Sequence, residues 1–209
     1  KRARHWEPGL LFGPWPGSFS ISVFPVPYRF HIHFDSATEF LALHGSPNAM
    51  SRWPVLPDPP LPLLITGIAG VAGYNAFDYF QRRYPGQVIG TRRADNVLLS
   101  GPAIEACDIY DADVMQRLFD RYQFASVLSC EGTCKLKSCE LDPWLAWRVN
   151  VAGVDNLLET IGDADVRLIH LSVDLVYSGT GSGGYVEHDP PDPVTIYGKT
   201  MSHAEQLIL

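Results

Sequence analysis

The sequence predicts an α/β fold built on a doubly wound parallel sheet. Three observations carry this prediction: an apolar run over residues 61–66, a glycine-rich turn directly after it, and a strand-then-helix order that repeats to residue 209. A run that is apolar throughout is typical of a parallel strand covered on both faces. Strands that alternate with helices need right-handed crossovers, which place helices on both sides of the sheet.

The glycine-rich turn places Gly67, Gly70 and Gly73 three positions apart. Gly67 permits a tight bend, Gly70 lets the backbone approach a phosphate, and Gly73 lets the following helix pack closely on the strand. The helix N-terminus offers unpaired N–H groups and the positive end of the helix dipole. The alternative is a plain structural turn. The sequence favours a site for a dinucleotide pyrophosphate, formed by Thr66, Gly67, Ile68, Ala69, Gly70 and Gly73.

The remaining elements follow at short intervals. The first helix is expected to end near Tyr84, because a Pro-Gly pair follows it. Asp111 is expected to cap a second helix, whose apolar face is Val114, Leu118 and Tyr122. Further strands are expected over residues 87–91, 104–108, 125–130 and 167–173.

A long helix is expected to open at Asp142 and Pro143, with the aspartate as N-cap and the proline in the first turn. Its larger apolar residues are Trp144, Trp147, Val151, Val154 and Leu158. A glycine- and proline-rich loop over residues 178–193 separates the fifth strand from a last helix over residues 196–209.

Residues 1–60 differ from the rest of the chain. They are rich in proline and tryptophan and hold no sustained period of either 2 or 3.6. We expect an irregular or disordered extension there, with Met50 as a candidate natural start. The alternative is a small N-terminal element of its own. Residues 61–209 form the predicted sheet domain.

Composition excludes several classes of partner. The net charge of −7 does not indicate nucleic-acid binding. No apolar run approaches the roughly 20 residues of a membrane span, so no membrane partner is expected. The four cysteines form no Cys-x-x-Cys pair, and His31 and His33 have no third ligand nearby, so we expect no metal site. Reduced thiols and the lack of a secretory signal favour a cytoplasmic protein.

In a doubly wound sheet, ligands bind beyond the carboxyl ends of the strands. Arg92 and Arg93 follow the second strand, where guanidinium groups suit a ribose 2′-phosphate better than a free hydroxyl. The pair therefore favours NADP(H) over NAD(H), with a solvated basic pair as the alternative. Asp108 and Ile109 follow the third strand and are placed to touch the adenine.

Several ordered motifs between Leu61 and Leu209 resemble the extended short-chain dehydrogenase/reductase family, also known as the NAD-dependent epimerase/dehydratase family. Within it, the spacing of Glu187, Asp189 and Pro190 resembles the dTDP-4-dehydrorhamnose reductases and their non-enzymatic relative, the methionine adenosyltransferase β subunit. The resemblance rests on the glycine turn, Asp108, residues 149–157, residues 171–179 and residues 197–200.

The resemblance implies a Rossmann-type fold, a nicotinamide cofactor and a nucleotide-sugar-like substrate. It also implies a possible homodimer through the long helix. Natural members of the family continue beyond the point that matches Leu209, so the resemblance implies a domain without its C-terminal substrate-binding part.

The family's chemistry uses a tyrosine, a lysine four residues later, and a serine or threonine four residues before the aromatic residue of a Val-Tyr or Val-Phe pair. By resemblance the tyrosine is Tyr197, which also contacts the cofactor, but the other two positions hold Met201 and Val173. Lys199 lies about 200° around the helix from Tyr197 and is a poor substitute. Ser172 alternates to the face of the strand opposite Val173.

These departures predict impaired catalysis. A free tyrosine has a pKa of about 10, and without the lysine Tyr197 should stay protonated at pH 7. Loss of a positioned acid–base partner typically removes about 10²–10⁴ in rate. A reduction suffers less, because a neutral tyrosine can still donate a proton. Glu131 is a further departure, since a carboxylate beside a pyrophosphate would weaken binding unless it turns outward.

Two functions remain open at this point. In the first, NADPH delivers hydride to a keto group on a nucleotide-linked sugar, Tyr197 gives the proton, and Asn150 on the long helix helps to order the site. In the second, the chain is a binding or regulatory protein whose dinucleotide pocket persists without turnover. Family frequencies favour the first function, and the Val173 and Met201 positions favour the second.

Overall fold

A computed structural model of the chain describes residues 58–132, 135–186 and 188–209, together with two N-terminal strands. These strands, β1 (Phe19–Val23) and β2 (Phe30–Phe34), pair antiparallel. The segment expected to be irregular therefore contains two paired strands. The other residues up to position 57, Met50 among them, lie outside the described residues, as do the side chains of His31 and His33.

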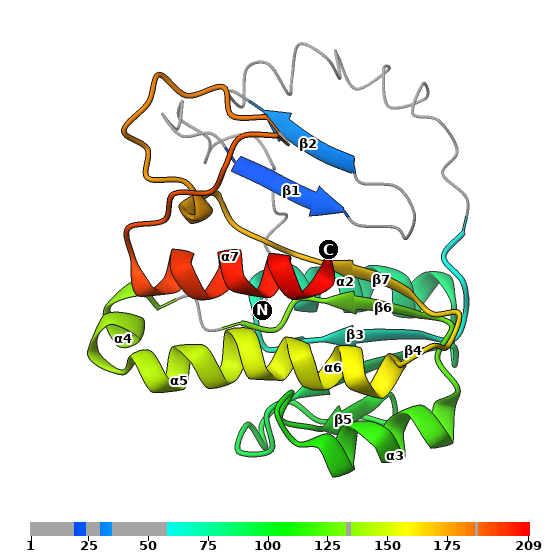
Figure 1. Ribbon diagram of the computed structural model, residues 1–209. Coiled ribbons are helices and arrows are strands. Elements are labelled where there is room, and N and C mark those ends of the chain that lie inside the picture. The colour runs from blue at the N-terminus through cyan, green and yellow to red at the C-terminus, as the bar shows by residue number, and fades with distance from the viewer. Residues whose placement is uncertain (1–18, 24–29, 35–57, 133–134, 187) are drawn as a thin grey trace, which may run out of the picture.

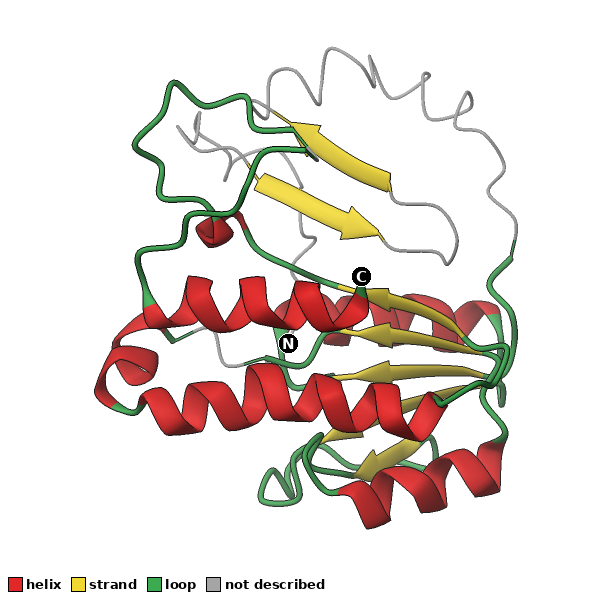
Figure 2. Ribbon diagram, viewed as in Figure 1, coloured by secondary structure: helices red, strands yellow, loops and turns green. Residues whose placement is uncertain are grey.

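The main sheet has five parallel strands in the order β5-β4-β3-β6-β7 (Figure 1). Helices lie on both of its faces, which confirms the predicted doubly wound α/β fold (Figure 2). Its strands are β3 (Leu63–Thr66), β4 (Val88–Arg92), β5 (Ile104–Ala106), β6 (Ser126–Ser129) and β7 (Arg167–His170).

Two of the strands, β5 and β7, end two or three residues before their predicted ends. β7 ends at His170 rather than Val173, because its neighbour β6 ends at Ser129 and offers no further ladder beyond Leu171. Similarly, β5 pairs with β4 on one side only and ends at Ala106. The shorter strands bring residues 171–173 and 107–109 into the loops at the carboxyl edge of the sheet, where a ligand would bind.

The helices that follow the strands are α2 (Val71–Arg83), α3 (Ala112–Tyr122), α4 (Leu136–Leu141), α5 (Pro143–Trp147), η2 (Arg148–Ala152), α6 (Gly153–Ile161), η3 (Asp174–Val176) and α7 (Ile196–Ile208). The sequence predicts α2, α3, the α5–η2–α6 helix and α7, but neither α4 nor η3. Asp111 and Asp142 cap α3 and α5 as expected, and Thr195 caps α7. No helix among the described residues has both the length and the apolar character needed to cross a membrane.

Alternation along the strands divides the core between the two faces of the sheet. Leu64, Val127 and Leu168 belong to the cluster packed with α3 and α6, whereas Ile65 packs with Ile68 and Phe77 on the α2 side. The buried stripe of α3 is Met115, Leu118 and Phe119, so only Leu118 of the three predicted residues belongs to it. Val114 and Tyr122 pack only at the edge of this cluster.

The long helix is interrupted by the π-helical turn η2. Trp144 and Trp147, which the sequence places on its apolar side, are exposed by 72% and 40%. The helix instead buries Val149, Val151, Val154 and Leu157. A π turn inserts an extra residue per turn and rotates the helix after it, so a simple period of 3.6 does not describe both halves.

Candidate functional site

The glycine-rich turn is closed to side chains at two of its three glycines. Gly67 has a φ of +68°, and a Cβ there would lie 2.7 Å from the Cys130 carbonyl oxygen. A Cβ on Gly73 would lie 2.3 Å from the Gly67 carbonyl oxygen. Gly70 is exposed, with the nearest atom 3.4 Å from a Cβ built there. Gly67 and Gly73 therefore let β3, β6 and α2 meet, whereas Gly70 leaves the outer side of the turn bare.

The N-terminus of α2 is open to an anion. Its N-cap is Gly70, no side chain caps the first turn, and the first turn holds no acidic residue. The Gly70 N–H donates to the Gly67 carbonyl at 2.9 Å, which fixes the bend. Amides in the first turn of a helix have no intrahelical acceptor, and with the helix dipole they attract phosphate or carboxylate groups.

A cavity of about 430 Å³ lies against this turn. Seven of the residues that the sequence predicts for cofactor binding line it: Gly67, Ala69, Gly70, Arg92, Arg93, Asp108 and Ile109. The other four do not: Tyr197, described below, and three residues of the turn. Thr66 and Ile68 are fully buried beneath the turn, and Gly73 lies inside the contact between the turn and α2. These three shape the loop rather than face the cavity.

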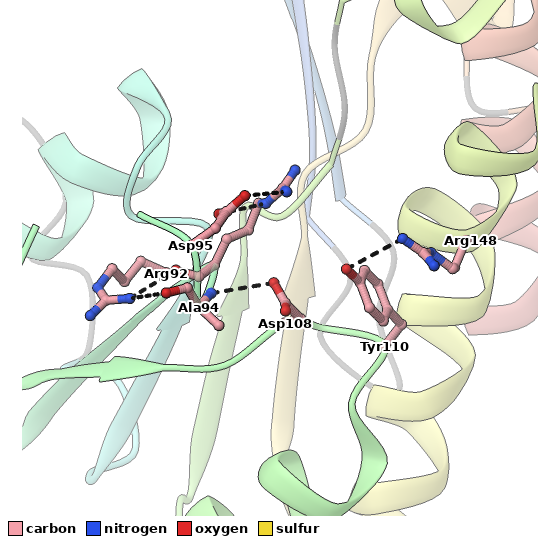
Figure 3. Close-up of polar contacts among 7 residues, drawn as sticks. Arg92, Ala94, Asp95, Asp108, Tyr110 and Arg148 are labelled. Atoms are coloured by element: carbon pink, nitrogen blue, oxygen red, sulfur yellow. Dashed lines mark hydrogen bonds and ion pairs between the residues drawn. The ribbon is translucent and has the colours of Figure 1, made fainter. Parts of the chain in front are cut away.

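The two arginines at the end of β4 behave differently, and Arg92 is labelled in Figure 3. The Arg92 guanidinium donates to the Leu99 carbonyl at 2.6 Å and to the Arg93 carbonyl at 2.8 Å, so it holds the loop that it belongs to. Arg93 is exposed and forms a two-pronged ion pair with Asp95, at 3.2 and 2.7 Å. The sequence predicts two free guanidinium groups here. The structure instead has a structural arginine, Arg92, and an exposed arginine, Arg93, which is already paired with a carboxylate.

Asp108 and Ile109 form the cavity wall after β5. The Ala94 N–H donates to Asp108 Oδ1 at 3.4 Å, which ties this wall to the arginine loop (Figure 3). Ile109 is buried, and its carbonyl accepts a hydrogen bond from Asn156 Nδ2 at 2.7 Å. A Cβ on Gly153 would lie 2.4 Å from Ile109 Cγ2, so α6 packs directly against this wall.

Glu131 turns into the cavity instead of outward. Its carboxylate accepts a hydrogen bond from the backbone N–H of Gly67, the first glycine of the turn. Burial, followed by the charge of Asp108, raises the pKa of Glu131 to about 7, against smaller lowering effects of Arg93 and of the Gly67 hydrogen bond. The site therefore holds an acid that is half-ionised near neutral pH.

Tyr197 lies outside this cavity, in the first turn of α7. It is only 7% exposed and packs in a cluster with Cys139, Ala146, Val176 and Met201. Val173 packs against the same cluster, and Lys199 is exposed on another side of α7. The two positions where the family carries polar groups are therefore part of an apolar cluster around the tyrosine.

Asn150 acts on the position of α7. Its Nδ2 donates to Thr200 Oγ1 at 2.9 Å, and that hydroxyl donates to the Tyr197 carbonyl at 2.9 Å. Asn150 is 1% exposed and sits in the π turn, which directs its side chain toward α7. Asn150 is therefore a positioning residue, which links η2 to the turn of α7 that carries Tyr197.

Sequence reasoning missed one whole side of the cavity. This side comes from α4, from the long helix and from the residue after Ile109: Tyr110, Lys135, Ser138, Leu145 and Val149. Tyr110 also stacks under the Arg148 guanidinium, 4.4 Å from its ring centroid. Lysines at positions 135 and 137, between a strand and a helix in an acidic chain, are the signal that could have pointed to this segment.

A buried polar row crosses the sheet below the turn. Thr66, Ser129 and His170 are register partners on β3, β6 and β7, and His170 Nδ1 lies 3.1 Å from Ser129 Oγ. Burial lowers the pKa of His170 to about 4, so it is neutral at physiological pH. Among the described residues, no group of three or more His, Cys, Asp or Glu side chains could hold a metal ion.

The fold and the site define a class: a Rossmann-type domain of the short-chain dehydrogenase/reductase kind, with a glycine-rich loop at the carboxyl end of its central strand β3. The family described as the RmlD substrate binding domain matches residues 61–209. The chain belongs to this family.

Two curated relatives show how far the match extends. The methionine adenosyltransferase 2 subunit beta of Mus musculus is 30% identical over 148 residues, which are 70% of this chain and 42% of the relative. A probable low-salt glycan biosynthesis reductase of Haloferax volcanii is 27% identical over 144 residues, which are 69% of this chain and 47% of the relative. The chain thus spans less than half the length of these relatives.

Solved structures share the fold. A hypothetical dTDP-4-dehydrorhamnose reductase from Sulfolobus tokodaii superposes with a TM-score of 0.63 at 22% identity, over 70% of this chain and 51% of that one. A Bacillus anthracis dTDP-4-dehydrorhamnose reductase in complex with NADP gives 0.60 at 22% identity, over 73% and 50%. A Bordetella bronchiseptica enzyme in complex with NAD and UDP gives 0.61 at 22% identity, over 71% and 49%.

Proposed function

We propose that the chain binds a nicotinamide dinucleotide in the cavity beside the glycine-rich turn. The observation that carries this proposal is the turn itself, where Gly67 and Gly73 exclude side chains and α2 begins without a cap. Gly70, on the bare side of the turn, would hold the pyrophosphate, and Asp108 and Ile109 would contact the adenine. Structures of this fold crystallised with NADP and with NAD support the class of ligand.

We propose that the site prefers NADP(H) to NAD(H) because of Arg93. Arg93 is the exposed guanidinium at the end of β4, and Arg92 is occupied by backbone carbonyls. A 2′-phosphate would have to displace Asp95 as the partner of Arg93. The preference is therefore expected to be modest, because the incoming phosphate replaces an ion pair that already exists.

For the reaction, we propose a reductase of the dTDP-4-dehydrorhamnose reductase type with impaired catalysis. NADPH would supply hydride to the keto group of a nucleotide-linked sugar, and the Tyr197 hydroxyl would supply the proton. The impairment follows from Val173 and Met201, which contribute no hydroxyl and no positive charge near that tyrosine. Asn150 contributes by holding α7 in place.

A second function, a non-catalytic regulatory subunit, is favoured by one observation. Tyr197 is 7% exposed and packed among apolar side chains, which suits a structural tyrosine as well as a reacting one. The relatedness to a methionine adenosyltransferase β subunit supports this alternative. Both functions use the same dinucleotide site.

A cytoplasmic location belongs to the proposal too, supported by free thiols at Cys107, Cys130 and Cys139.

Titration of the full chain with NADPH and with NADH tests the dinucleotide site. We expect saturable binding, a raised melting temperature and a lower Kd for NADPH. Gly70→Val should raise the Kd about tenfold or more, because a valine there fits the extended N-cap backbone but covers the phosphate position.

Gly101→Val is the matched control, since Gly101 is exposed and a Cβ there meets only Ile104 at 3.6 Å. This control should bind as the parent chain does. No shift in melting temperature at millimolar NADPH, or equal binding by the Gly70 variant, would refute the proposed site.

A further inference from the structure

The carboxylate of Glu131 occupies the place where an incoming phosphate would be bound. Glu131 follows β6, and its backbone nitrogen lies 2.8 Å from the position of a Cβ on Gly67, so strand end and turn are in direct contact. The side chain lines the same cavity as Gly67 and Gly70 and accepts the Gly67 N–H. A donor needed by an anionic ligand is therefore already taken by an internal anion.

The charged groups around Glu131 do not neutralise it. Asp108, two residues after β5, lines the same cavity and raises the pKa of Glu131, whereas Arg93 lowers it but is paired with Asp95. Lys135, before α4, lines the same cavity and is exposed. Burial raises the pKa of the adjacent Cys130 thiol to about 12, so this neighbour is neutral. Two carboxylates thus face a site meant for a pyrophosphate.

A pyrophosphate brings two further negative charges to this loop. An ionised Glu131 would repel them at short range in a partly desolvated site and would compete for the Gly67 amide. A protonated Glu131 does neither, and its O–H becomes a donor that can bond a phosphate oxygen. The same side chain therefore opposes the ligand in one protonation state and supports it in the other.

We propose that dinucleotide binding in this site is coupled to the uptake of one proton by Glu131, so that this residue makes the affinity depend on pH. The inference rests on the proposed dinucleotide site and adds its regulation. The step is a simple proton transfer: solvent provides the proton, the carboxylate takes it on binding, and dissociation of the ligand returns it. Acidification across neutral pH therefore loads the site, and alkalinisation empties it.

The test measures the Kd of NADH for the full chain from pH 6.0 to pH 8.5. NADH is the probe because it lacks a 2′-phosphate, whose second pKa near 6 would add its own pH dependence. With the Glu131 pKa at about 7, the Kd should rise roughly 30-fold over this range, because only the protonated fraction is competent to bind. Calorimetry at pH 8 in two buffers of different ionisation enthalpy should report uptake of about one proton.

Glu131→Gln is the decisive variant, since glutamine keeps the shape and removes the titration. It should bind NADH with nearly the same Kd at every pH and take up no proton. Asp155→Asn is the matched control, because it removes one exposed carboxylate from α6, away from the cavity, and should keep the parent pH profile. Asp108→Asn should shift the profile to lower pH, because it removes a charge that raises the Glu131 pKa.

The outcomes separate the two proposals. A pH-dependent Kd that Glu131→Gln abolishes supports the coupling. A Kd that is flat with pH in the parent chain, or a pH dependence that survives in Glu131→Gln, overturns it while the dinucleotide site stands. No binding of NADH or NADPH by either chain at any pH overturns the dinucleotide site, and the coupling with it.

Discussion

Two buried ionisable side chains give this domain opposite responses to pH. His170 has a folded-state pKa of about 4, below its ordinary 6.5, so its contribution to stability is present above pH 6.5 and is lost as the pH falls toward 4. Glu131 has a raised pKa of about 7, so it favours the folded state at low pH and weakens it as the pH rises from 4.5 through 7. Between them, these residues favour a stability optimum on the acid side of neutrality.

The contribution of His170 can be isolated by replacement with glutamine, which is neutral at every pH. Between pH 7 and pH 5 the parent chain should lose about 2 kcal/mol of unfolding free energy that His170→Gln does not lose, because only the unfolded histidine gains a proton in that window. Urea unfolding at the two pH values measures this difference. His188→Gln, at an exposed position, should behave like the parent chain. Equal losses in His170→Gln and the parent would contradict the assignment.

At the scale of the elements, the sequence predicts what is periodic and misses what depends on contact. The apolar runs of β3, β4 and β6 and the caps at Asp111 and Asp142 are local signals, so these elements lie where expected. The six-residue helix α4 is too short to show a period. The π turn is not visible in the sequence, and it carries Asn150, whose buried side chain contacts α7. These two elements contribute Ser138 and Val149 to the cavity wall.

The candidate site divides in the same way. Its glycines were predictable, since Gly67 and Gly73 are required by backbone contacts that any side chain would break. The direction of a long side chain was not: Arg92 turns to carbonyl groups of its own loop, and Glu131 turns inward. Whether such a side chain faces ligand or protein depends on backbone carbonyls and amides that a sequence does not locate.

The contact between Val173 and the cluster around Tyr197 gives a test of catalysis. Val173 packs on the cluster that holds Tyr197 and Met201, which lie one turn apart on α7. Val173→Thr combined with Met201→Lys restores a hydroxyl and a positive charge to the tyrosine's surroundings. We expect the double variant to reduce a dTDP-linked 4-keto sugar with NADPH about 10²-fold faster than the parent chain, measured as NADPH consumption.

Tyr197→Phe in the background of the double variant is the control, and it should remove the gain. A gain that survives this control would show that the tyrosine is not the proton donor. Parent-chain turnover at rates normal for related reductases would contradict the claim of impairment.

At the scale of the whole molecule, four of the large exposed apolar residues lie in the α4–α5 segment. Leu141 and Trp144 are 76% and 72% exposed, and Leu136 and Trp147 lie near them in the chain. Trp147 also packs against the His203 ring of α7, with centroids 4.7 Å apart. Large exposed apolar side chains in one segment are typical of an interface. This segment is therefore the surface on which we place the homodimer implied by the family resemblance.

Trp144→Glu tests the homodimer. At tens of micromolar, the parent chain should have the mass of two chains by sedimentation equilibrium, and the variant should have the mass of one, because a buried charge without a partner opposes association. Val97→Glu adds the same charge to another exposed apolar position and should leave the mass unchanged. A monomeric parent chain would remove this surface from consideration.

The contacts of the Arg92 guanidinium determine which substitutions could change the choice of ligand. Its guanidinium spans from the Leu99 carbonyl to the Arg93 carbonyl, and lysine, with a single nitrogen, could not replace both contacts at once. One arginine therefore braces the loop after β4, and in the proposed dinucleotide site its neighbour would meet the substituent of the ribose. Substitutions at Arg93 or Asp95 can retune recognition on an unchanged frame, whereas a substitution at Arg92 would deform the frame for every ligand alike.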